Sequence, residues 1–123
     1  MSVAKHPSKA AVARAPLTSP EQAELCAEIL KAVAHPLRLR IVATLCAGDQ
    51  NVNGLSELLG AKQSIVSQQL RILRMHDLVR VTRQNGFALY SLAEPHLEVL
   101  VGCMGQCVAE RCADRGAARR TRG

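Results

Sequence analysis

Residues 62–91 combine two adjacent patterns, a helix with one polar face and a β-hairpin. Over residues 62–74, apolar side chains recur at the spacing of an α-helix, at Val66, Leu70 and Leu73. Amide, hydroxyl and guanidinium groups occupy the other side. They belong to Gln63, Ser64, Ser67, Gln68 and Arg71. The pattern predicts a helix that packs through one face and leaves the other free for a polar partner.

A hairpin signal follows this helix directly. Two β-rich runs, residues 79–83 and 87–91, flank Gln84, Asn85 and Gly86. Asn-Gly between such runs is the strongest short-range indication of a two-stranded turn. The sequence therefore predicts a small β-wing after the polar-faced helix.

A short helix is predicted before the polar-faced one. Residues 53–60 have Asn53 as a candidate N-cap and Gly60 at the carboxyl end. A short helix, a turn, a polar-faced helix and a hairpin, in this order, are typical of a winged helix-turn-helix. We therefore expect a mainly α fold with a small β-wing.

The polar face suits the major groove of duplex DNA. Gln and Asn can pair bidentately with adenine, Arg with guanine, and Ser with a base or a phosphate. Any solvent-exposed helix face has a similar composition, so the adjoining wing is what favours the DNA interpretation. The candidate DNA-binding residues are Lys62, Gln63, Ser64, Ser67, Gln68, Gln69, Arg71, Arg83 and Asn85.

The positive charge is unevenly distributed. The net charge is +6, but residues 20–110 together carry −1, and the excess lies in residues 1–19 and 111–123. Within the central part, residues 62–91 carry +4. Basic charge is thus concentrated where contacts with DNA phosphates would form.

Four segments resemble the ArsR/SmtB family of dimeric bacterial repressors. They are Ala-His-Pro-Leu-Arg-Leu at 34–39, Leu-Ser-Glu-Leu at 55–58, Ser-Gln-Gln-Leu-Arg-Ile-Leu-Arg at 67–74 and Phe-Ala-Leu-Tyr-Ser-Leu at 87–92. The resemblance spans about Glu21 to Glu110. It implies four helices, two strands and a final helix, and a homodimer built from the first and last helices. It also implies release from double-stranded operator DNA when a metal, metalloid or thiol oxidant is sensed.

One departure from the family concerns the sensing site. Many arsenic sensors of this family carry a Cys-x-Cys pair where this sequence has Asn51 and Asn53. Asparagine is a poor ligand for a soft ion. If the chain is a sensor, its ligands must therefore lie elsewhere.

Three cysteines lie in the last predicted helix, which runs from about residue 94 to residue 114, with Gly116 as its stop. Cys103 and Cys107 are about 40° apart around the helix axis, and Cys112 is about 140° from Cys107. One straight helix cannot bring the three thiols together. Two such helices, antiparallel across a two-fold axis, would place Cys103 opposite the Cys112 of the other chain and Cys107 near the crossing.

Three thiolates favour trivalent arsenic or antimony as the inducer, whereas zinc would require a fourth ligand. The alternatives are a mixed zinc site of Glu94, His96, Cys107 and Glu110, a dithiol switch that forms a disulfide or polysulfide, and cysteines that only pack an interface. Two other protein classes are a small thiol oxidoreductase and a DNA-binding protein without a ligand. The oxidoreductase is disfavoured because Cys103 and Cys107 lie in mid-helix with no general base nearby.

The first predicted helix follows Ser19 and Pro20, an N-cap and a first-turn proline. Its apolar stripe of Leu25, Ile29, Ala32 and Val33 is a candidate dimer face. Cys26 and Cys46 are expected to pack as small hydrophobic residues. His35 is expected to be a structural or capping residue, and Arg38 and Arg40 to form salt bridges.

The predicted organisation is a disordered basic arm (1–18), one sensor domain (19–115) and a basic tail (116–123). No segment is apolar enough to span a membrane, and no signal peptide is apparent. We expect a cytoplasmic protein with its five cysteines as thiols. We also expect it to be non-enzymatic.

Overall fold

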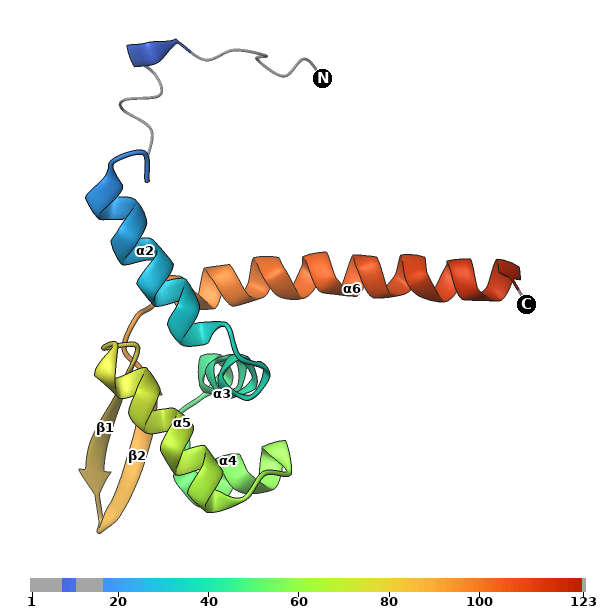
Figure 1. The fold of residues 1–123 in the computed structure, drawn as a ribbon. Coiled ribbons are helices and arrows are strands. Elements are labelled where there is room, and N and C mark those ends of the chain that lie inside the picture. The colour runs from blue at the N-terminus through green and yellow to red at the C-terminus, as the bar shows by residue number, and fades with distance from the viewer. Residues whose placement is uncertain (1–7, 11–16, 123) are drawn as a thin grey trace.

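The computed structural model describes residues 8–10 and 17–122, with side chains described as far as residue 117. Its elements are α2 (Pro20–Val33), α3 (Pro36–Ala47), α4 (Val52–Leu59), α5 (Gln63–Met75), β1 (Val79–Gln84), β2 (Phe87–Leu92) and α6 (His96–Arg122) (Figure 1). The predicted winged helix-turn-helix, with its final helix, is confirmed. Most of the predicted basic arm lies outside the described residues.

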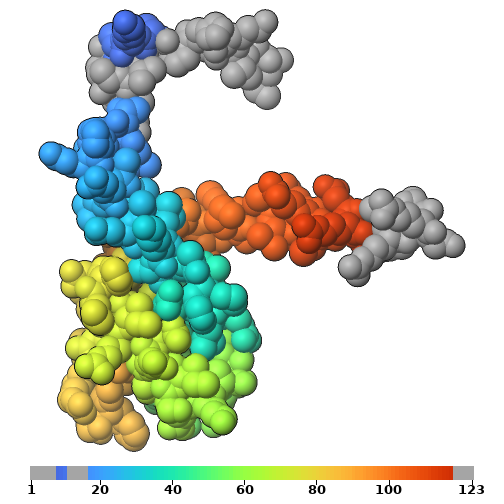
Figure 2. All heavy atoms as spheres, in the orientation of Figure 1, coloured from blue at the N-terminus to red at the C-terminus, as the bar shows by residue number. Residues whose placement is uncertain are grey.

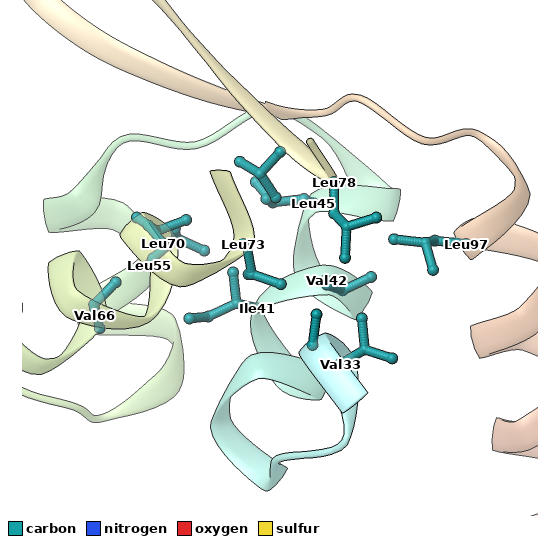
Figure 3. Close-up of a cluster of buried hydrophobic side chains, with 12 residues drawn as sticks. Val33, Ile41, Val42, Leu45, Leu55, Val66, Leu70, Leu73, Leu78 and Leu97 are labelled. Carbon is teal, nitrogen blue, oxygen red and sulfur yellow. The ribbon is translucent and has the colours of Figure 1, made fainter. Parts of the chain in front are cut away.

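The core is built around α3 and consists of aliphatic side chains (Figure 3). Ile41 and Val42 of α3 are fully buried, and α3 packs against α2, α4, α5, β2 and α6. The three predicted core residues of α5, Val66, Leu70 and Leu73, have no exposed surface. Burial of each such side chain stabilises the fold by about 1.5–3 kcal/mol.

The wing is an antiparallel hairpin in which Val79 pairs with Leu92 and Gln84 with Phe87. Asn85 and Gly86 both have positive φ, 51° and 81°, as the predicted two-residue turn requires. The loop before α4 holds the wing to the body, because Gln50 and Tyr90 exchange two backbone hydrogen bonds of 3.0 and 2.8 Å.

The amino end of α4 differs from the expectation. Asn51, not Asn53, is the N-cap, and its Oδ1 accepts the N–H of Gly54 at 2.7 Å. Two asparagines two residues apart both satisfy the capping preference, so sequence could not choose between them. At the carboxyl end, Gly60 adopts the left-handed conformation at φ 62°, as predicted.

The apolar stripe of α2 is divided between two environments. Ala32 and Val33 are buried in the chain's own core, and Ile29 packs against it. Leu25 is 60% exposed. The carboxyl end of the predicted dimer face is therefore part of the protomer's own core, and only its amino end remains free.

Helix α6 is longer than predicted, because it continues through Gly116 to Arg122. A glycine inside a helix costs only about 1 kcal/mol, and the surrounding alanines and arginines are good helix formers. Leu97 is buried and Leu100 packs against the core, but the rest of α6 projects away from the body (Figures 1 and 2). Among the described residues, no helix is long and apolar enough to cross a bilayer.

Two glycine substitutions should have opposite effects on stability. Gly60→Ala should destabilise the fold by about 1 kcal/mol, because a side chain disfavours positive φ. Gly116→Ala should instead raise helicity and stabilise α6 by up to about 1 kcal/mol, since a Cβ added to Gly116 would meet no other atom within 4 Å. Thermal unfolding followed by circular dichroism measures both effects. Loss of helicity in Gly116→Ala would contradict a continuous α6.

Candidate nucleic-acid interface and thiol helix

The polar face of α5 points away from the core. Ser64, Ser67, Gln68 and Arg71 are exposed, and within the described parts of the chain their side chains form no hydrogen bond or ion pair. No side chain caps the first turn of α5, where the exposed Lys62 holds the N-cap position. These donors and acceptors are therefore free to contact bases and phosphates.

Gln63 links the two helices of the helix-turn-helix. Its Nε2 donates to Oδ1 of Asn53 at 2.8 Å, and both residues are exposed. Asn51 meanwhile caps α4. Both asparagines at the position of the family's Cys-x-Cys pair thus have structural roles.

Gln69 does not share the environment of the other candidate DNA-binding residues. It is half-buried, and its Oε1 accepts a hydrogen bond from Nη1 of Arg38 at 2.9 Å. We therefore remove Gln69 from the candidate DNA contacts. The signal that could have revealed this is its position on the helix, about 100° from Gln68 and beside the apolar stripe.

The expectation for Arg38 was also wrong, because it forms no salt bridge among the described residues. Its partners are uncharged: the amide of Gln69 and the carbonyl of Ala32, which lies 2.6 Å from Nε. Arg40 is exposed, and it too has no ion pair in the described ranges. The structural role expected for His35 is confirmed, since its Nδ1 accepts the N–H groups of Leu37 and Arg38 at the start of α3.

The basic side chains of the helix and wing form an uncompensated positive surface. Arg83 and Asn85 lie at the exposed end of the hairpin. The basic residues, all exposed, are Lys62, Arg71, Arg74, Arg80 and Arg83. None of them has an acidic partner among residues 8–10 and 17–117. An uncompensated surface of this kind attracts the phosphate backbone of DNA.

The three thiols of α6 are accessible but separate. Cys103 and Cys112 are exposed, Cys107 is half-buried, and all are free thiols. The nine residues between Cys103 and Cys112 correspond to a rise of about 13–14 Å. Accordingly, the described part of one chain contains no group of three or more His, Cys, Asp or Glu residues placed to hold a metal ion.

Cys46 is in a different environment from the thiols of α6. It packs against the core, and burial together with the nearby Glu98 carboxylate raises the pKa of its thiol. A raised pKa disfavours the thiolate, which is the form that binds metals and reacts. The packing role expected for Cys46 is therefore supported.

Glu94 and His96 form a contact at the start of α6. Oε1 of Glu94 lies 2.7 Å from Nδ1 of His96 and accepts the backbone N–H of His96 at 3.1 Å. These hydrogen bonds lower the pKa of the Glu94 carboxyl group. His96 is 94% exposed.

Comparison with known proteins gives a consistent family. Residues 35–81 match the family described as "Bacterial regulatory protein, arsR family". The chain is 36% identical to the uncharacterized HTH-type transcriptional regulator Rv0081 of Mycobacterium tuberculosis over 95 residues, which are 76% of this chain and 83% of the relative. The crystal structure of Rv0081 has a TM-score of 0.67 and 34% identity, covering 79% of this chain and 97% of that one.

Two further solved structures are similar. The transcriptional repressor BigR from Xylella fastidiosa has a TM-score of 0.67 and 33% identity, covering 71% of this chain and 89% of its own. HlyU from Vibrio cholerae has a TM-score of 0.68 and 26% identity, covering 72% of this chain and 97% of its own. These proteins share the winged helix-turn-helix of this chain.

The Glu94–His96 contact should make a small, pH-dependent contribution to stability. Since folding lowers the pKa of Glu94, this contribution is complete above the carboxyl's unfolded-state pKa of about 4.3 and is lost as the pH falls through the lower folded-state pKa. An NMR titration of the Glu94 side chain measures the midpoint. In His96→Ala it should move up toward the ordinary value. Identical midpoints in the two proteins would contradict the assignment.

Proposed function

Because this chain belongs to the arsR family of bacterial regulatory proteins, which are DNA-binding transcription regulators and not enzymes, we propose a specific repressor mechanism. The protein is a cytoplasmic homodimer that leaves its operator when cysteines of α6 capture trivalent arsenic or antimony. The observation that carries this proposal is the placement of three free thiols on the part of α6 that projects from the body.

The homodimer is supported by the apolar side of α6. Leu97, Leu100 and Val101 pack on the protomer's own core. On the same side of the helix, within about 100°, lie Met104 and Val108, and each is 51% exposed. An apolar stripe that extends from the core onto a projecting helix favours a second helix as its partner. A two-fold arrangement would let each α6 cover the other.

Such a dimer would bring the thiols together. Cys107 and Cys112 lie on opposite borders of the apolar stripe, each about 70° from its centre, and Cys103 lies beyond Cys107. In an antiparallel pair that crosses near residue 107, Cys103 of one chain faces Cys112 of the other. Three sulfur ligands suit the pyramidal coordination of trivalent arsenic or antimony.

Release from DNA would follow from the packing of α6. Helix α6 packs on α3, and α3 packs on α5. A dimer binds well only when its two recognition helices match half-sites about 34 Å apart. A ligand that moves one α6 relative to the other would therefore change this spacing and lower the affinity for DNA.

The zinc alternative requires a different dimer. His96 and Cys107 are separated along one helix by about 16 Å, so a site containing both needs two chains. The helices would then cross near residues 101–102 instead of near residue 107. One dimer has one register, so the zinc and metalloid sites exclude each other.

A dithiol switch is a second candidate, because one of the similar solved structures is that of reduced HlyU from Vibrio cholerae. That relative is thus described by its redox state, and this chain has five free thiols. Titrating the DNA complex with trivalent arsenic, trivalent antimony, zinc and a polysulfide separates the possibilities. Release by polysulfide alone would reject the metalloid proposal.

The polar face of α5 should read bases. Gln68→Ala should weaken binding to a duplex selected from a random library by the wild-type protein, at a cost of about 1–3 kcal/mol. It should change binding to a scrambled duplex of the same composition very little. Fluorescence anisotropy measures both affinities. Equal weakening on the two duplexes would reject base readout by Gln68.

The wing should contribute phosphate contacts that do not depend on sequence. Arg83→Ala should weaken binding to both duplexes and reduce the slope of log affinity against log salt by about one. The exposed Arg40, on α3, provides the matched control as Arg40→Ala. A loss on the selected duplex alone would show that Arg83 reads sequence instead.

Metalloid capture should be a property of the dimer. Cys103→Ser and Cys112→Ser should each preserve DNA binding and abolish release by trivalent arsenic. A heterodimer with one substitution in each chain should keep one complete site and bind one ion, where the wild type binds two. Mass spectrometry of the intact dimer measures this stoichiometry.

The controls for this experiment are the two thiols outside α6. Cys26→Ser and Cys46→Ser should respond to arsenic nearly as the wild type does, because both side chains are half-buried away from the projecting helix. If the heterodimer bound no ion while the wild type bound two, the site would lie within one chain and the cross-dimer arrangement would be rejected.

A further inference from the structure

Pro36 leaves a buried carbonyl without its usual partner. In an α-helix, the carbonyl of residue i accepts the N–H of residue i+4, so Ala32 would be paired by residue 36. Proline has no N–H group. Ala32 is only 4% exposed, so water is a poor substitute. This carbonyl at the end of α2 therefore needs another donor.

Arg38 supplies that donor from the first turn of α3. Its Nε donates to the Ala32 carbonyl at 2.6 Å, and its Nη1 donates to Oε1 of Gln69 at 2.9 Å. Both bonds come from one planar guanidinium group, which fixes their directions relative to each other. One half-buried side chain thus joins the end of α2 to the middle of α5.

The bond to Gln69 controls a specific degree of freedom of α5. The apolar side chains of α5 hold it against the core, but such contacts are non-directional. A hydrogen bond to one position beside the apolar stripe resists rotation of the helix about its axis. Gln68 is the next residue, so the same rotation would move its amide relative to the bases.

We infer that Arg38 is a positioning residue, which sets the rotation of α5 against α2 and thereby determines how well the protein distinguishes its operator from other DNA. Arg38 itself need not touch DNA. The inference rests on operator binding through α5, which is part of the proposed function, and is independent of the inducer.

The test compares two duplexes, one selected from a random library by the wild-type full-length protein and one scrambled. Arg38→Met should lose about tenfold in affinity for the selected duplex and less than twofold for the scrambled one. Arg38→Lys, which keeps the charge but not the two-armed geometry, should recover only part of the loss. Arg40→Met, two residues away, is the matched control and should leave the ratio of affinities unchanged.

A second substitution keeps the test decisive if Arg38→Met fails to fold. Gln69→Leu removes only the bond to α5, so it should lower the ratio of affinities while the bond to Ala32 remains. In folded proteins, Arg38→Met should have little further effect on the ratio once Gln69 is leucine, because the two act through one contact.

Three results would overturn the inference: an unchanged ratio in Gln69→Leu, equal weakening on both duplexes, or independent effects of the two substitutions. Each would leave Arg38 with a purely structural role. If the wild-type protein selected no duplex at all, the proposed repressor function would fail instead. The two failures are therefore distinguishable.

Discussion

The burial of α3 is the interaction on which the rest of the structure depends. Its side chains Ile41, Val42 and Leu45 lie at the centre of the aliphatic core, and α3 contacts four helices and one strand of the wing. The helix that would read DNA and the helix that carries the thiols are therefore fixed to the same element. Because protein cores are close-packed, α6 cannot shift at its base without a response in α3. This packing provides a physical connection between two distant surfaces.

Helix α6 has two parts with different requirements. Its first turns belong to the core, with Leu97 buried, whereas Met104 and Val108 continue the same apolar side beyond the body. The thiols border this uncovered stretch. Any chain that covers the stripe will therefore lie beside the thiols, and a ligand bound there acts on the same interface. Dimerisation and sensing are, in this proposal, properties of one surface.

Sequence was sufficient where structure depends on neighbours along the chain. The periodicity of Val66, Leu70 and Leu73 predicted α5, and Asn85-Gly86 predicted the wing. It was insufficient where two local solutions were equivalent, as for the α4 cap, or where a signal is permissive, as for Gly116. The Arg38–Gln69 bond joins residues 31 positions apart, so no local pattern contained it. For the DNA face, this one long-range contact separated Gln69 from the exposed side chains beside it.

The two asparagines before and within α4 explain why sensing would have to be remote in this chain. Asn51 starts α4, and Asn53 ties it to Gln63 of α5, so both positions stiffen the helix-turn-helix. Soft-ion ligands at these positions would replace those hydrogen bonds and place the ligand directly beside the DNA-reading helix. With the thiols on α6, the ligand must act through α3 and through the joint made by Arg38. A rigid DNA-reading unit is then an advantage, because a displacement of α6 moves it as a whole instead of being absorbed by loose local packing.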